Sequence, residues 1–244
     1  MEFFVGVDPW DAARVNMPTV ISVVRLRSRK SKFQVGEWIM DSGAFSTILN
    51  HGGYPHEPDE YAGEIERWKG NGNLLAAVSQ DYMCEPEMLK ITGMSVEEHQ
   101  ALTIERYDSL SEIVQDCYLM PVLQGWQAEE YVRHVRDYGA RLTPGQWVGV
   151  GSVCRRNAGS AAVEDILLAI RSERPDLLLH GFGLKTTVLR SGLVRHLLHS
   201  ADSRAWSYAA RREGRDRNDW REAVIFAQKI QNMVYQRHLV EVGL

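Results

Sequence analysis

Four polar side chains stand where short apolar segments end, and their chemistry suits one reaction centre. Asp41 and Asp81 follow apolar runs in the first part of the chain, and Gln124 and Asp202 occupy corresponding places later. An ionised carboxylate behind an apolar strand costs desolvation free energy unless it is paired or used. A lone aspartate at such a place is most simply a helix cap or a turn residue. Four such places together favour a shared active-site rim.

Two carboxylates beside an amide suit a reaction at the anomeric carbon of a nucleoside. One carboxylate attacks C1′ or stabilises the developing cation, and the other moves a proton on the leaving or incoming group. Asp41 and Asp202 could form this pair. Asp81 and Gln124 would then read a flat heterocycle, because a carboxylate and an amide together match its donor and acceptor edge. This hypothesis requires a fold that brings the four side chains together.

Small residues accompany these polar groups. A glycine lets another molecule approach the backbone closely, and a strand that ends in small residues can turn its amides toward a ligand. The Gly-x-Gly pattern at 149 and 151 is not a dinucleotide fingerprint, since position 154 is a cysteine. We expect five small residues to shape the pocket: Ser42, Gly43, Gly125, Gly151 and Ser152.

The charged residues are unevenly distributed. The net charge of −4 argues against a surface that binds nucleic acid indiscriminately. Two basic runs nevertheless occur, over residues 25–32 and 204–221. Each run alone is most simply a solvated surface, but together they would line a track for phosphates. The residues expected to contact nucleic acid are Arg25, Arg27, Lys30, Arg204, Arg211 and Arg212.

Cysteine usage and hydropathy indicate a protein of a reducing compartment. The three cysteines, Cys84, Cys117 and Cys154, are too far apart for a Cys-x-x-Cys metal clasp, and their odd number suggests no disulfide framework. No apolar run approaches membrane-spanning length, and the first residues lack a signal-peptide pattern. We therefore expect a cytoplasmic protein with no membrane partner.

The elements that must position these residues alternate along the chain. Strands are predicted over residues 5–7, 19–24, 37–40, 74–79, 118–123, 147–151 and 177–183. Helices are predicted over residues 59–69, 95–114, 128–138, 161–171 and 187–193. Such alternation predicts parallel pairing, and a single α/β domain over residues 1–244. We predict a (β/α)8 TIM-type barrel, possibly irregular, with an open doubly wound sheet as the alternative.

Several short motifs are similar to those of one enzyme family. Residues 41–45 resemble the Asp-Ser-Gly-Gly-Phe motif of tRNA-guanine transglycosylases, and residues 123–125 resemble their Val-Gln-Gly motif. Residues 78–81, 150–153 and 180–183 resemble further segments of the family in the same order. Residues 201–208 resemble a segment of the archaeosine branch whose aspartate is the nucleophile. The order and spacing make the set more specific than any single motif.

The chain departs from that family at its zinc site. The tRNA enzymes carry a Cys-x-Cys-x-x-Cys cluster completed by a histidine, whereas here the cluster is absent and Gln231 stands in place of the histidine. We therefore expect no zinc-binding insertion, no metal and no cofactor. Because that element also helps the family to dimerise and hold tRNA, its loss argues against a tRNA substrate. A zinc-free relative of this kind resembles the DpdA proteins of phages and bacterial islands, which insert 7-deazaguanine bases into DNA.

The resemblance implies a mechanism and partners. Asp202 would attack C1′ of a guanosine deoxyribonucleotide, expel guanine and form a covalent glycosyl-enzyme. Asp41 would deprotonate the incoming preQ0-like 7-deazaguanine base. Asp81, Gln124 and the small residues would hold either base, and Tyr208 is a stacking candidate because of its motif. The implied partners are DNA with a flipped or single-stranded target, and accessory proteins or a second copy of the chain.

Three alternatives remain open at this stage. The first is a zinc-free enzyme that modifies tRNA by the same chemistry. The second is a non-catalytic barrel subunit that binds nucleic acid for a partner enzyme. The presence of both Asp202 and Asp41 argues against it, because an inactive site does not need a nucleophile. The third is an unrelated barrel hydrolase with a metal held by His51, His56 or His180, which ranks last because no paired ligand spacing occurs.

Overall fold

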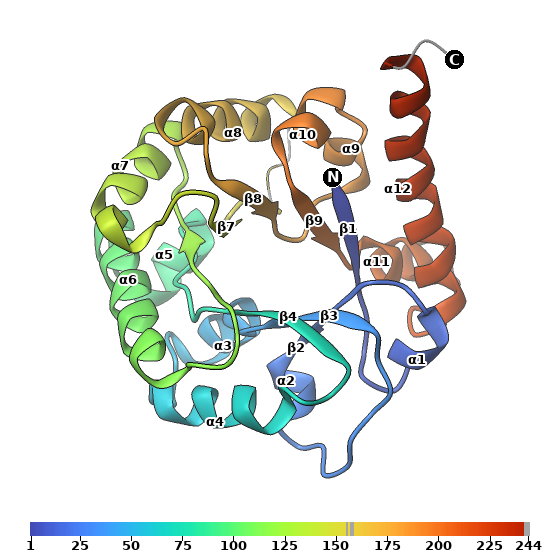
Figure 1. Ribbon diagram of the computed structural model, residues 1–244, viewed down its shortest axis with the longest axis horizontal. Helices are drawn as coiled ribbons and strands as arrows, with labels where there is room; N and C mark the ends of the chain where they lie inside the picture. Colours follow the sequence, from blue (N-terminus) through green and yellow to red (C-terminus); the bar gives the residue numbers. More distant parts are fainter. Residues whose placement is uncertain (155, 157–158, 242–244) are drawn as a thin grey trace.

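Nine parallel strands form a nearly closed barrel with helices around it (Figure 1). The structure, a computed structural model, describes residues 1–154, 156 and 159–241. The order of the strands around the sheet is β5-β4-β3-β2-β1-β9-β8-β7-β6. The strands are β1 (Glu2–Gly6), β2 (Thr19–Ser22), β3 (Glu37–Asp41), β4 (Asn73–Val78), β5 (Leu119–Met120), β6 (Val122–Leu123), β7 (Trp147–Val150), β8 (Leu178–Gly181) and β9 (Ser200–Ser203).

The two ends of this sheet are consecutive in the chain. β5 pairs with β4, and β6 pairs with β7, so a single segment joins both edges. Pro121 divides this segment, since proline has no N–H for a ladder hydrogen bond. Its carbonyl still accepts a hydrogen bond from the Gly149 amide at 2.8 Å. The predicted barrel is confirmed in irregular form, and the open doubly wound sheet does not describe this fold.

The helices lie outside the strands (Figure 1). The predicted capping box at the start of α6 is present: the Glu98 amide donates to Ser95 Oγ at 3.2 Å, and the Ser95 amide donates to Glu98 Oε2 at 2.7 Å. The helices are α1 (Ala12–Val15), α2 (Val23–Leu26), α3 (Ala44–His51), α4 (Pro58–Trp68), α5 (Pro86–Thr92), α6 (Val96–Ile113), α7 (Ala128–Tyr138), α8 (Ala161–Glu173), α9 (Thr186–Leu189), α10 (Gly192–Leu197), α11 (Ala205–Arg212) and α12 (Trp220–Glu241), with a 3-10 turn at Gly139–Arg141.

Besides the single strand expected over residues 118–123, which is divided into β5 and β6, two predicted elements differ from the structure. The strand expected over residues 19–24 ends at Ser22, and the chain continues into α2 with Val23 and Leu26 buried. A spacing of three buries both on one helical face, so these apolar residues are helical rather than extended. The helix expected over residues 187–193 is two helices, because Ser191 ends α9 and caps α10 by accepting from the Val194 amide at 3.2 Å.

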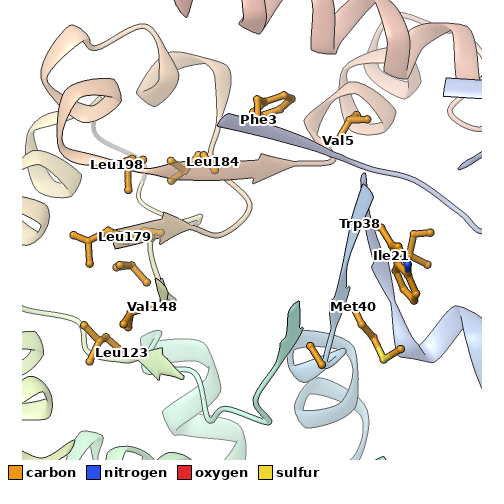
Figure 2. Close-up of a cluster of buried hydrophobic side chains, with 14 of the residues drawn as sticks. Phe3, Val5, Ile21, Trp38, Met40, Leu123, Val148, Leu179, Leu184 and Leu198 are labelled. Atoms are coloured by element: carbon orange, nitrogen blue, oxygen red, sulfur yellow. The ribbon is translucent and has the colours of Figure 1, made fainter. Parts of the chain in front are cut away.

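Alternate residues of each strand face different layers. Phe3, Val5, Trp38 and Met40 belong to the layer between strands and helices (Figure 2). The intervening residues fill the barrel interior, in a cluster formed by Phe4, Val20, Ile39, Ala76, Val78, Met120 and Val122. This period of two determines which strand residues can reach a site inside the barrel.

We predict that Gly72→Ala destabilises the protein by about 3 kcal/mol, against about 1 kcal/mol for Gly52→Ala. Both glycines have positive φ, at 65° and 71°. A Cβ at Gly72 would collide with Val35 O and lie 2.8 Å from Gly36 O, whereas nothing lies within 4 Å at Gly52. Urea unfolding of the two variants measures the difference, and equal losses would show that backbone strain alone matters at Gly72.

Candidate active site

A cavity of about 430 Å³ opens where several strands end. This volume lies within the range of small-molecule sites. Its walls are largely apolar, and polar groups enter from β3, β9 and the loops behind β4, β6 and β7. The lining includes Asp41, Asp81, Glu85, Gln124, Gly151, Ser152, Asp202 and Arg204, with Val7, Val20, Phe45, Met83 and Phe182. The fold thus brings the four polar side chains of the sequence hypothesis into one cavity.

Asp41 is the last residue of β3, and the turn behind it holds its carboxylate. Its Oδ2 accepts a hydrogen bond from the Gly43 amide at 3.1 Å. Gly43 has φ 73°, and a Cβ there would lie 2.5 Å from the Val24 side chain, so only glycine fits this turn. Burial, and then the neighbouring charge of Asp202, raise the pKa of Asp41 to about 6, against a hydrogen bond from Ser22 that lowers it. The two carboxylates are therefore close enough to interact.

Asp202 lies in β9 and is anchored through one oxygen. Its Oδ1 accepts from the Gly183 amide at 2.9 Å and lies 3.3 Å from His180 Nε2. In the described part of the chain, Oδ2 has no hydrogen-bond partner. One carboxylate oxygen is thus held while the other is available to a molecule in the cavity.

Asp81 and Gln124 form the other polar wall. Gln124 Nε2 donates a short hydrogen bond to Asp81 Oδ2, and Ser42 Oγ donates to Asp81 Oδ1 at 3.3 Å. Ser152 Oγ lies 2.7 Å from Gln124 Oε1, which fixes the orientation of the amide. Burial, and then the charge of Asp41, raise the pKa of Asp81 to about 7. Near neutral pH this wall presents both a donor and acceptors to a ligand.

Glu85 also lines the cavity, and sequence reasoning missed it. Its Oε2 lies 2.9 Å from Ser152 Oγ, which in turn accepts from the Cys84 amide at 2.8 Å. These contacts hold Ser152 at φ 53°, an uncommon conformation for a residue other than glycine. Every residue of the loop over residues 79–85 is buried, so the loop has no alternation of polar and apolar residues that would mark Glu85 as a pocket residue.

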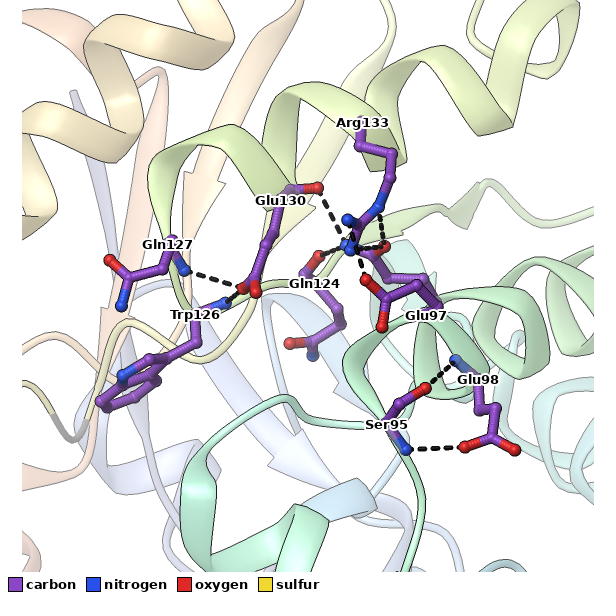
Figure 3. A network of polar contacts seen from close by, with 9 residues as sticks. Ser95, Glu97, Glu98, Gln124, Trp126, Gln127, Glu130 and Arg133 are labelled. Atoms are coloured by element: carbon purple, nitrogen blue, oxygen red, sulfur yellow. Dashed lines mark hydrogen bonds and ion pairs between the residues drawn. The ribbon is translucent and has the colours of Figure 1, made fainter.

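Helices α6 and α7 hold the backbone of Gln124 from behind (Figure 3). Gln100 Nε2 donates to the Gln124 carbonyl at 2.6 Å, and Arg133 donates to Gln100 Oε1 at 3.0 and 3.1 Å. Arg133 is itself paired with Glu97 at 2.9 Å. The Gln124 amide donates to His134 Nδ1 at 2.9 Å. Burial lowers the pKa of His134 to about 3, so this ring stays neutral and can accept.

The remaining predicted pocket residues lie at different depths. Ser42 and Gly43 do not line the cavity but hold Asp81 and Asp41. Gly151 lines it, and a Cβ there would collide with the amide of Gln124, so the glycine makes room for that side chain. Gly125 lies outside the lining, where a Cβ would stand 3.0 Å from the Tyr131 ring. Tyr208 is 67% exposed on α11 and does not line the cavity.

Two of the predicted basic residues meet beside the cavity. Arg204 contacts both carboxylate oxygens of the buried Asp8, at 2.6 and 3.2 Å, and Arg25 Nε lies 3.3 Å from Asp8 Oδ1. Both guanidinium groups keep exposed surface, so the two basic runs do converge here. Asp8 lies just after β1, between the ends of β2 and β9.

The other basic residues are spread over the surface. Lys30 lies on the loop that leads to the start of β3. In this loop the Phe33 amide donates to Oδ1 of Asn71, which lies just before β4. The loop is therefore at the end of the barrel opposite the cavity. Arg27 is half-buried next to α2. Arg211 and Arg212 are exposed on α11, and the Arg212 guanidinium lies 6.0 Å from the Tyr208 ring.

Two searches of the described residues found nothing. In residues 1–154, 156 and 159–241, no three His, Cys, Asp or Glu side chains are grouped as ligands for a metal ion. Within the same residues, no helix has the length and apolar character to cross a membrane.

The irregular parallel barrel, with carboxylates and an amide in one cavity at its mouth, is that of a tRNA-guanine transglycosylase-like protein. The model of the DpdA family, described as DeoxyPurine in DNA protein A, matches residues 3–227. The chain therefore belongs to the DpdA family, whose role is DNA modification by a guanine transglycosylase-type enzyme. No curated protein sequence matches the chain significantly.

We predict that Asp81 makes stability depend on pH. The pKa of its carboxyl rises from the ordinary 3.8 to about 7 on folding, so the folded state binds the proton more tightly. The stabilisation is complete below about pH 4 and is lost as pH rises through about 7. Urea unfolding from pH 4 to 8 should show a flatter pH dependence for Asp81→Asn than for the wild type.

Asp137→Asn, at an exposed position on α7, is the matched control and should follow the wild-type profile. A profile of Asp81→Asn parallel to that of the wild type would contradict the raised pKa of Asp81.

Proposed function

We propose that this protein is a DNA-guanine transglycosylase that exchanges guanine in DNA for a 7-deazaguanine, preQ0-like base through a covalent aspartyl-glycosyl intermediate. Family membership supports the DNA-modifying role. The observation that carries the finer assignment is that Asp41 and Asp202 line one cavity together with the Asp81–Gln124 pair. A nucleophile, a proton carrier and a base-reading edge are the parts that this exchange needs.

In the first half-reaction, Asp202 Oδ2 bonds to C1′ of a deoxyguanosine and the C1′–N9 bond breaks. The leaving guanine keeps the bonding electron pair and takes a proton from Asp41. This assignment is supported by the anchoring of Asp202 Oδ1 on the Gly183 amide, which leaves Oδ2 to attack. It is also supported by the pKa of Asp41, about 6, which suits proton transfer near neutral pH.

The second half-reaction reverses the first with a different base. The incoming 7-deazaguanine gives its N9 proton to Asp41, N9 bonds to C1′, and the C1′–Oδ2 bond breaks. The bonding electrons return to Asp202, and Asp41 again carries the proton for the next turnover. We propose no cofactor, because carboxylates of the chain supply both the nucleophile and the proton carrier.

The polar wall and the apolar walls divide the task of holding the base. Asp81 and Gln124 would pair with the donor and acceptor edge shared by guanine and its deaza analogue. Phe45 and Phe182 supply apolar surface for a planar ring. A base inside a stacked duplex cannot reach this cavity, so the target must be flipped or single-stranded. Arg25 and Arg204 would then hold backbone phosphates beside it.

We predict that Asp202→Ala abolishes DNA modification. In cells supplied with preQ0, mass spectrometry of DNA nucleosides should find a modified deoxynucleoside with the wild type and none with the variant. Asp137→Ala, on the outside of α7, should modify DNA like the wild type. Unmodified DNA with the wild type would count against the exchange.

Labelled guanine offered with matched DNA and tRNA distinguishes the two polymers. Exchange into tRNA alone would overturn the DNA assignment. Full activity of an Asp202→Asn variant in a reconstituted system would favour the non-catalytic subunit.

We predict that Arg25→Ala weakens DNA binding in a salt-dependent way. Loss of one phosphate contact should reduce the slope of log K against log salt by about 1. Substitution of Arg25 should disturb the fold less than substitution of Arg204, because Arg204 keeps both of its contacts with the buried Asp8 in the Arg25→Ala variant. Lys30→Ala is the control, since Lys30 lies on the loop at the opposite end of the barrel. Equal salt slopes for Arg25→Ala and the wild type would remove Arg25 from the interface.

A further inference from the structure

A chain of buried polar groups runs through the barrel beneath Asp202. Trp147 Nε1 donates to Ser200 Oγ at 2.7 Å, and Ser200 Oγ lies 2.9 Å from His180 Nδ1. His180 Nε2 lies 3.3 Å from Asp202 Oδ1. His180 and Ser200 are fully buried, and neither lines the cavity. These residues therefore reach a ligand only through Asp202.

The partners of the two ring nitrogens favour one tautomer of His180, because the Asp202 carboxylate at Nε2 only accepts. An indole N–H only donates, so Ser200 Oγ accepts from Trp147 and its own hydrogen is free for His180 Nδ1. Nδ1 then accepts, and the ring proton lies on Nε2, where it points at Asp202 Oδ1. The opposite tautomer would set a nitrogen lone pair against the carboxylate and leave the Ser200 hydrogen without an acceptor in this chain.

The imidazole has little freedom to leave this position. Its ring lies 4.8 Å from the Phe182 ring, 5.8 Å from the Trp147 ring and 6.1 Å from the Phe4 ring, in edge-on arrangements. Both nitrogens already have partners inside the barrel. His180 is thus engaged as a donor to Asp202, which argues against its use as a metal ligand.

We propose that His180 is a positioning residue that holds the nucleophilic carboxylate of Asp202 through an Nε2–H hydrogen bond, with the opposite ring nitrogen held by Ser200 Oγ. The proposal rests on the proposed role of Asp202. Together with the Gly183 amide, the imidazole gives Oδ1 two donors and fixes the plane of the carboxylate. Oδ2 is then oriented for attack without the loss of rotational freedom at each turnover.

The same hydrogen bond acts in both half-reactions. When Oδ2 bonds to C1′, Oδ1 becomes the carbonyl oxygen of the ester and still accepts from Nε2–H. When the C1′–Oδ2 bond breaks, the returning charge spreads over both oxygens, and the two donors on Oδ1 stabilise the carboxylate as leaving group. No proton moves along the buried chain in either half-reaction.

The test compares His180→Leu with His180→Gln. Leucine removes the donor, whereas the glutamine Nε2 amide can replace it near the same place. We expect His180→Leu to form the covalent glycosyl-enzyme about 10- to 100-fold more slowly in single turnovers, with an unchanged Kd for DNA. His180→Gln should recover most of the rate. A merely structural histidine would change stability without this difference between rate and binding, and without rescue by glutamine.

The outcomes separate this inference from the proposed function. Covalent complex with Asp202→Ala would overturn both the nucleophile and the positioning role. No complex with Asp202→Ala, together with a wild-type rate for folded His180→Leu, would overturn only the inference.

A spectroscopic measurement remains informative even if His180→Leu does not fold. In wild-type protein with ¹⁵N-labelled histidine, NMR should show the His180 ring as the neutral Nε2–H tautomer, assigned by its loss in His180→Gln. An Nδ1–H tautomer would overturn the inference.

Discussion

The burial of three carboxylates around one cavity is the constraint on which the rest of the site depends. Asp81 and Asp202 are buried and Asp41 is half-buried, so each carboxylate needs hydrogen-bond donors in place of water. Backbone amides of Gly43 and Gly183 and the side-chain amide of Gln124 provide them. Burial, and then mutual repulsion, raise the pKa values of Asp41 and Asp81 to about 6 and about 7, so both carboxyls titrate near neutral pH.

The nearly closed barrel allows polar side chains to be buried, because it brings their hydrogen-bond partners together. Strand alternation sends apolar residues such as Phe4 and Ile39 into the barrel, and places His180 and Ser200 beneath Asp202. A half-satisfied polar group here would destabilise the fold, whereas a fully connected chain stiffens the site. Each member of the chain from Trp147 to Asp202 has a partner. The buried polar residues of the barrel interior and the Asp202 carboxylate are thus parts of one hydrogen-bonded structure.

Much of the architecture was predictable because its signals are local. The helix expected over residues 128–138 is α7 with the same bounds, and the capping box before α6 is formed. The order of short motifs indicated the family that the match over residues 3–227 establishes. The short crossovers α1 and α2 were not predicted, since four residues carry too little periodicity to distinguish a helical turn from a strand. Glu85 was missed because its loop is buried without any repeating pattern.

The sequence by itself indicated most of the strands, the helices α4, α6, α7 and α8, and which chemistry the polar groups at 41, 81, 124 and 202 could perform. It did not predict β9 or α12. Only the tertiary structure decided which of the polar groups meet. Arg204 and Asp8 are 196 positions apart, yet they pair because β1 lies beside β9 where the barrel closes. Lys30 shares a basic run with Arg25, yet the chain between them turns toward the far end of the barrel. Strand ends follow from local preference, whereas proximity follows from the pairing of distant strands, which no local pattern contains.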